Sequence, residues 1–75
     1  MACIDPEGRL SWAGRRILTA IQNPAKLEEV AQQTDLPRYR LRSGLREMIG
    51  AGLAEEKNET YVITTKGRSL LEVQR

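Results

Sequence analysis

Arginine is concentrated in one short stretch of this chain. Nine consecutive residues without an acidic side chain contain Arg38, Arg40, Arg42 and Arg46. A guanidinium group donates several hydrogen bonds in one plane, which suits phosphate oxygens and the O6 and N7 atoms of guanine. The net charge of the whole chain is only +2, because the glutamates lie elsewhere. We therefore expect a local basic patch on a nearly neutral body.

The residue types that carry most enzyme chemistry are scarce. The sequence has no histidine and one cysteine, Cys3. Cys3 therefore has no partner for an intrachain disulfide, and a zinc site would lack histidine and further cysteine ligands. The glycines at 44, 50 and 52 are not spaced as a phosphate-binding loop. We expect no enzyme activity, no catalytic residue, no cofactor and no metal. We take Cys3 to be incidental, and the lack of a secretory leader or long apolar run favours a cytoplasmic protein that crosses no membrane.

Seventy-five residues are enough for one small domain. We divide the chain into an N-terminal extension, residues 1–10, and a domain, residues 11–75. Residues 5–8 have turn chemistry, although Asp5 is also a candidate helix cap. A first helix is expected over residues 11–22, with Ser11 as its cap and Arg15 and Arg16 pointing outward.

Two further helices are expected on either side of a tight turn at residues 35–37. The first begins either at Asn23, with Pro24 in its first turn, or near Leu27. The second spans about residues 37–51 and ends at Gly52 in a left-handed conformation. Its inward stripe consists of Leu41, Leu45, Met48 and Ile49. Two helices joined by a short turn form the helix-turn-helix device that places side chains in a DNA groove.

The second helix of this pair is expected to turn its polar side chains away from the core. Stepping 100° per residue from Leu41 and Leu45 leaves Arg42 on one shoulder and Arg38 in the first turn. The same rotation places outward Tyr39, Arg40, Ser43, Arg46 and Glu47. Arginine can contact guanine or phosphate, and Tyr39 and Ser43 can contact phosphate or a thymine methyl group. The alternative is an ordinary solvated helix face.

A β-hairpin and a closing helix are expected in the remaining segment. The strands are residues 53–57 and 61–64, and Thr64 or Thr65 caps a last helix. The closing helix is either a dimer element or a cover for the first helix. Trp12 and Tyr61 are interpreted as core or groove-edge residues. The expected fold is mainly α with a small β-hairpin, in the order α-α-α-β-β-α.

The segments TDLPRYRLRSGLREMIGAGLAEE and YVITTKGRSLL resemble the winged helix-turn-helix DNA-binding domains of bacterial and archaeal transcriptional regulators. The most similar types are the multiple-antibiotic-resistance and arsenical-resistance regulators. The resemblance implies a recognition helix in the major groove and a wing near the DNA backbone. It makes Lys57 a candidate wing contact. The candidate DNA contacts of the recognition helix are Arg38, Tyr39, Arg40, Arg42, Ser43 and Arg46.

We therefore expect sequence-specific binding of double-stranded DNA and a role in transcription regulation, either by a single chain or by a homodimer. The expected wing is unusual, because Glu55, Glu56 and Glu59 would repel phosphate. This acidity leaves a second reading open, in which the winged helix is a protein-protein interaction module that binds no DNA.

Overall fold

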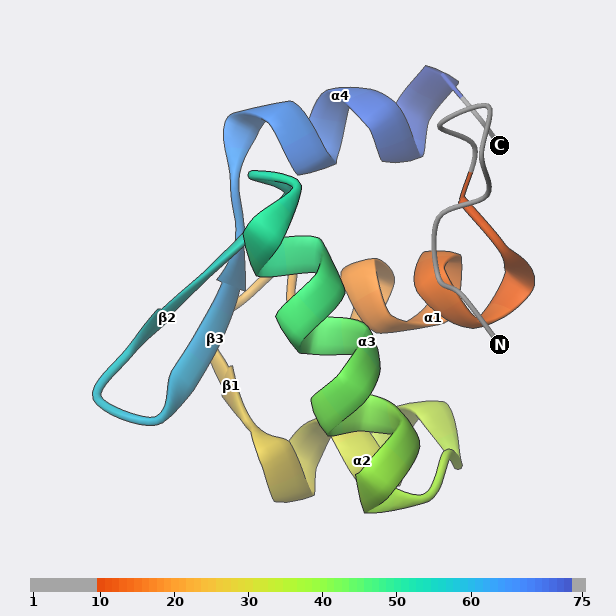
Figure 1. Ribbon diagram of the computed structural model, residues 1–75, viewed down its shortest axis with the longest axis vertical. Helices are drawn as coiled ribbons and strands as arrows, with labels where there is room; N and C mark the ends of the chain where they lie inside the picture. Colours follow the sequence, from red (N-terminus) through yellow and green to blue (C-terminus); the bar gives the residue numbers. More distant parts are fainter. Residues whose placement is uncertain (1–9, 74–75) are drawn as a thin grey trace.

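The computed structural model describes residues 10–73. Cys3 and the turn expected at residues 5–8 lie outside this range. Within it, the helices and strands are α1 (Trp12–Ala20), β1 (Ala25–Lys26), α2 (Leu27–Thr34), α3 (Arg38–Gly50), β2 (Ala54–Lys57), β3 (Thr60–Ile63) and α4 (Thr65–Val73). In Figure 1, α3 runs through the middle of the molecule, the β2–β3 hairpin projects to one side, and α4 lies across the top.

Helix α1 begins as its sequence predicts. The Oγ atom of Ser11 accepts a hydrogen bond from the backbone N–H of Gly14 at 3.1 Å, which caps the helix. The helix ends at Ala20, two residues before the expected end. Its Arg16 was expected to point outward but is half-buried, and its guanidinium lies 4.8 Å from the centre of the Trp12 ring. Trp12 itself is 66% exposed, so it is not a core residue.

The start of α2 is at the later of the two candidate positions, Leu27. The backbone N–H of Lys26 donates to the Glu29 carboxylate at 2.9 Å. An acid in the first turn thus accepts a hydrogen bond from the backbone N–H of the residue that precedes the helix. Just before it, Ala25 and Lys26 form a strand that the sequence did not predict. This strand pairs antiparallel with β3, which gives a sheet of order β1-β3-β2. The small sheet therefore anchors the start of α2 to the hairpin.

Helix α3 follows a turn in which Asp35 takes a left-handed conformation, with φ of 59°. Leu41, Leu45 and Met48 are fully buried, as their spacing predicts, whereas Ile49 is 36% exposed and lies at the edge of the core. The exit is a Schellman arrangement: Leu53 N–H donates to the Met48 carbonyl at 2.9 Å and Gly52 N–H to the Ile49 carbonyl at 3.0 Å. Gly52 has φ of 79°, which confirms the expected stop.

The β2–β3 hairpin closes through a two-residue turn. Asn58 and Glu59 have φ of 52° and 63°, the left-handed pair of a type I′ turn. Thr60 therefore belongs to β3, although a three-residue connection was expected. The register places Glu56 opposite Tyr61 and Lys57 opposite Thr60. This tight turn makes the hairpin a short projecting arm.

Thr64 is the cap of α4. Its Oγ atom accepts from Gly67 N–H at 3.0 Å and donates to the Gly52 carbonyl at 2.7 Å. The second contact ties the start of α4 to the exit of α3. Gly67 is buried because the Leu53 carbonyl occupies the space where a Cβ would lie. The helix buries Leu71 and leaves Val73 80% exposed.

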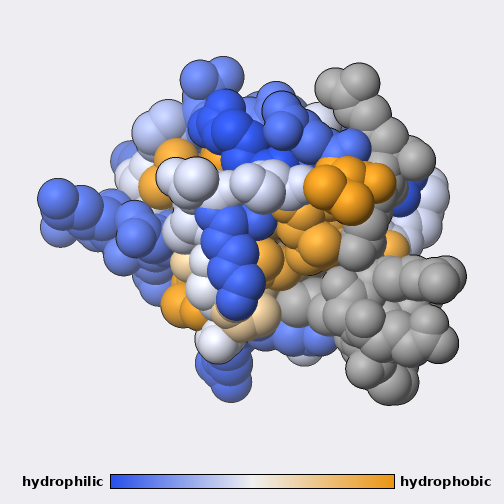
Figure 2. Space-filling view, turned by 90° about the horizontal axis from the view of Figure 1, so that it is seen from above, coloured by the Kyte–Doolittle hydropathy of each residue, from blue (hydrophilic) through white to orange (hydrophobic). Residues whose placement is uncertain are grey.

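All four helices contribute to one hydrophobic core within the described residues. Ile17, Leu18 and Ile21 from α1 and its end lie in the core, and α4 packs on α1, which is one of the two roles that we considered for it. Leu10, which we placed in the N-terminal extension, is also buried in this core. Seen from the side of α4, the surface shows hydrophobic areas between hydrophilic bands, and the hairpin projects as a hydrophilic arm (Figure 2).

Candidate nucleic-acid interface

Five of the six side chains predicted on the second helix of the pair meet at one surface. They line a shallow hollow of about 540 Å³ on the outer face of α3, formed by Arg38, Tyr39, Arg42, Ser43 and Arg46. We call this surface the α3 hollow. All five residues are exposed, and Tyr39 is 75% exposed. Residues three, four and seven positions apart share a helix face, which explains why they converge. The hollow offers guanidinium and hydroxyl donors but no carboxylate.

Arg40 does not join the α3 hollow. It is half-buried on the flank of α3, and Glu47, which we expected on the outer face, is half-buried on the same flank. The physical reason is that Gly44 is buried as well as Leu41 and Leu45. This widens the inward face toward Gly44 and brings residues 40 and 47 partly under cover. The acid expected on the outer face is thus absent from the α3 hollow.

Arg38 has a partner on the neighbouring helix. Its Nη2 lies 3.3 Å from Oε1 of Glu28, and the two side chains are 63% and 74% exposed. A pair this exposed contributes only about 0–1 kcal/mol, because water and salt screen it. The ion pair therefore orients Arg38 without removing it from the hollow.

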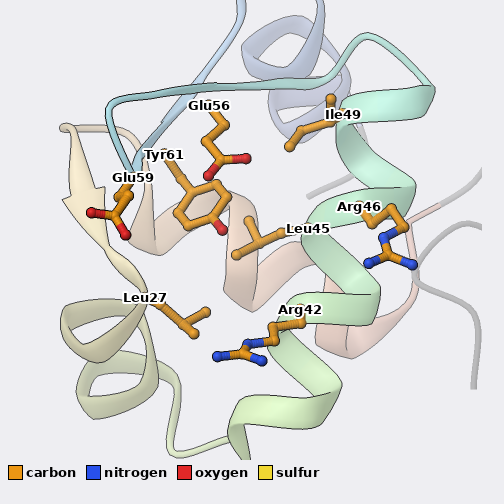
Figure 3. Close-up of a pocket in the computed structure, with 8 residues that line it drawn as sticks. All are labelled: Leu27, Arg42, Leu45, Arg46, Ile49, Glu56, Glu59 and Tyr61. Carbon is orange, nitrogen blue, oxygen red and sulfur yellow. The ribbon is translucent and has the colours of Figure 1, made fainter.

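A second concavity lies between α3 and the hairpin, with a volume of about 510 Å³. We call it the hairpin groove; its lining residues are Leu27, Arg42, Leu45, Arg46, Ile49, Glu56, Glu59 and Tyr61. Figure 3 shows Arg42 pointing from α3 toward the Leu27 and Tyr61 side chains, while Glu56 points into the groove beside Tyr61. The groove thus has an apolar floor, a basic wall on α3 and an acidic wall on the hairpin. It shares Arg42 and Arg46 with the α3 hollow.

Burial and the charged groups of the groove shift the pKa of Tyr61. Partial burial raises the pKa of this phenol above its usual 10.0, and the charge of Glu56 raises it further. Arg42 acts in the opposite direction, whereas Glu59 and side-chain hydrogen bonding to Glu56 add to the increase. Tyr61 itself is half-buried at the groove edge, which is one of the two positions that we expected for it.

Lys57 lies at the end of β2, next to the hairpin turn and apart from the α3 hollow. It is exposed, as are the three glutamates of the hairpin, Glu55, Glu56 and Glu59. The wing therefore carries one cation among three acids, as its sequence predicts.

The hairpin groove was not predicted from the sequence. Its walls come from three segments that are distant in the sequence, and their contact depends on how the sheet packs against α3. One signal was accessible: a two-residue turn at 58–59 would have placed Glu56 opposite Tyr61.

Residues 10–73 contain neither a candidate membrane span nor a candidate metal-binding group. No helix there is long and apolar enough to cross a membrane. No group of three or more histidine, cysteine, aspartate or glutamate side chains in this part of the chain could hold a metal ion.

Of the comparisons with known proteins, the one with solved structures found a match. No protein-family model matches the sequence, and no curated protein matches it. A solved structure of Bordetella bronchiseptica BpsR, a protein whose DNA binding is regulated by 6-hydroxynicotinic acid, matches with a TM-score of 0.80 and 22% identity. The match covers 91% of this chain and 54% of that one, so this chain spans about half the length of BpsR.

The likeness establishes the fold. The chain has the winged helix-turn-helix fold, with α2 and α3 as the helix pair and β2–β3 as the wing. The expected fold class, mainly α with a small β-hairpin, is confirmed. The short strand β1 is an addition to the expected order of elements.

Proposed function

We propose that this chain binds double-stranded DNA through α3 and acts in transcription regulation. The observation that carries the proposal is the α3 hollow, in which five donor side chains converge on the exposed face of the second helix of a helix-turn-helix. In this architecture the second helix enters the major groove, with its N-terminal half nearest the base edges. Four of the five hollow residues lie in that half of α3, and Arg46 lies beyond it.

The side chains divide into two roles. Arg42, one turn into α3, is suited to a bidentate contact with guanine, and Arg46 and Arg38 flank it for phosphate contacts. Tyr39 and Ser43 can donate to phosphate oxygens or contact a thymine methyl group. Arg40 lies on the flank, where it can reach only the adjacent DNA backbone.

The likeness to BpsR supports this function, because BpsR is itself a DNA-binding protein. One domain of this size presents little contact area, so tight binding favours two copies on two half-sites. We therefore propose a homodimer as the DNA-bound form.

The acidic hairpin favours a second candidate function, a protein-interaction module. Three exposed glutamates surround Lys57, and carboxylates near phosphate are unfavourable. Under this alternative the hairpin would contact a basic partner protein, and duplex DNA would not bind.

Fluorescence anisotropy with a pool of random-sequence duplexes at about 50 mM salt tests the proposal, because non-specific contacts are measurable there. We expect Arg42→Ala to weaken binding by about 1–3 kcal/mol. Arg68→Ala is the matched control, since Arg68 lies in a separate hollow formed with α1 residues. Selection from the same pool should then enrich particular sequences.

Two results would contradict DNA binding by α3. One is equal affinity of the wild type, Arg42→Ala and Arg68→Ala; the other is no binding by the wild type. Co-purification of a protein partner with a chain that binds no duplex would favour the interaction module.

A further inference from the structure

Arg42 and Arg46 belong to two surfaces at once. They line the α3 hollow, which is the proposed DNA-binding face, and also the hairpin groove. In Figure 3 the Arg42 guanidinium points toward the groove, whereas that of Arg46 lies farther from the hairpin. Arginine has a long side chain with several rotatable bonds, so a change of rotamer can move the guanidinium between the two surfaces. Arg42 therefore has two competing environments.

Two of the three hairpin carboxylates line the same groove as this arginine. Glu56 and Glu59 line the groove, whereas Glu55 does not, because neighbouring strand residues point to opposite faces. The two-residue turn fixes the position of Glu59, which has φ of 63°. Tyr61 lines the same groove, and in addition to burial the charges of Glu56 and Glu59 raise the pKa of its hydroxyl while that of Arg42 lowers it, in agreement with this placement.

We propose that Glu56 and Glu59 compete with DNA phosphates for Arg42 and so hold the DNA affinity of α3 below the level that its arginines alone would give. A carboxylate presents the same kind of charged oxygen acceptor as a phosphate, so an Arg42 guanidinium that the two carboxylates attract into the groove is less available to phosphate at the outer face of α3. The inference rests on the proposed function and adds specific residues that set its strength.

The competition has a physical signature. All the carboxylates involved are exposed, so the effect is moderate and is screened over about 8–10 Å at ordinary salt concentrations. Removing a groove carboxylate should strengthen duplex binding by about two- to five-fold at low salt. If the double variant Glu56→Gln/Glu59→Gln frees Arg42 for one more phosphate, the slope of log affinity against log salt should steepen by about 0.9.

The experiment compares three single substitutions, each of which removes one negative charge from the same hairpin. Duplex affinity is measured by anisotropy for Glu56→Gln, Glu59→Gln and the control Glu55→Gln, with thermal melting to verify folding. The same three substitutions are then made in the Arg42→Ala background. The double-mutant cycle isolates the coupling between each glutamate and Arg42.

Larger gains for Glu56→Gln and Glu59→Gln than for Glu55→Gln, which disappear in the Arg42→Ala background, would support the proposal. Equal gains for all three glutamates would overturn it, because they would reflect net charge alone. Gains that persist without Arg42 would also overturn it. A wild-type chain that binds no duplex would refute the proposed function, whereas binding with uniform gains would refute only this inference.

Discussion

Arg16 on α1 donates two hydrogen bonds to the backbone carbonyl of Thr34, the last residue of α2. Nε lies at 3.2 Å and Nη2 at 2.9 Å from that oxygen. The last carbonyls of a helix have no partner within it, so Arg16 satisfies a group that the turn into α3 would otherwise leave open. One side chain thus fixes the turn of the helix pair against α1.

Replacing Arg16 should therefore destabilise the fold although the residue is only half-buried. We expect Arg16→Ala to lower the free energy of unfolding by about 1–3 kcal/mol, since two charge-assisted hydrogen bonds are lost. Arg16→Lys keeps the charge but not the paired geometry, so it should have an intermediate effect. Urea unfolding measures both. An alanine variant as stable as the wild type would show that the contact contributes nothing.

Two glycines offer a matched pair of substitutions. Gly67→Ala should destabilise the chain by roughly 1–3 kcal/mol, because its Cβ would meet the Leu53 carbonyl and backbone cannot easily move aside. Gly50→Ala places a methyl group where nothing lies within 4 Å, so it should stabilise α3 by about 0.5–1 kcal/mol. Thermal or urea unfolding of the two variants gives the comparison. Similar changes for both would contradict the close approach at Gly67.

The salt dependence of duplex binding should report how many phosphates the α3 hollow contacts. For roughly four to six phosphates, log affinity should fall with log salt with a slope of about −4 to −5. Titrations at several salt concentrations measure it, and Arg46→Ala should reduce its magnitude by about one. A slope near zero would be incompatible with binding through arginine-phosphate contacts.

Titration of Tyr61 tests the charge arrangement of the hairpin groove without DNA. Its pKa lies above 10.0 in the folded chain, so Glu56→Gln should lower it and Arg42→Ala should raise it further. The folded state holds this proton more tightly than the unfolded state. Its contribution to stability is therefore complete below about pH 10 and is lost as the pH rises through the folded pKa. Phenolate absorbance in a Tyr39→Phe background measures it; no shift in either variant would contradict the arrangement.

The helices were largely predictable because their signals are local. Ser11, Gly52 and the stripe of Leu41, Leu45 and Met48 act through neighbours within a few residues, and each takes its expected role. Ile49 was misplaced because it lies at the edge of that stripe, where packing of the hairpin decides its exposure. Local periodicity cannot resolve such an edge position.

The features that could not be predicted depend on long-range contacts. Ala25 and Lys26 have low strand propensity and form β1 only because Tyr61 and Thr60 lie beside them. Arg16 gives no sign in the sequence of its contact with Thr34. The basic cluster on α3 was readable from residue types, but the burial of Gly44, which excludes Arg40 from it, was not.

The Thr64 hydroxyl has a mechanical consequence. By donating to the Gly52 carbonyl and accepting from the Gly67 N–H, it joins the segment that follows α3 to the first turn of α4. The Lys66 ammonium adds a bond to the Ala51 carbonyl at 3.2 Å. These bonds couple the start of α4 to the end of α3, so a tilt of α4 would strain the C-terminal end of α3.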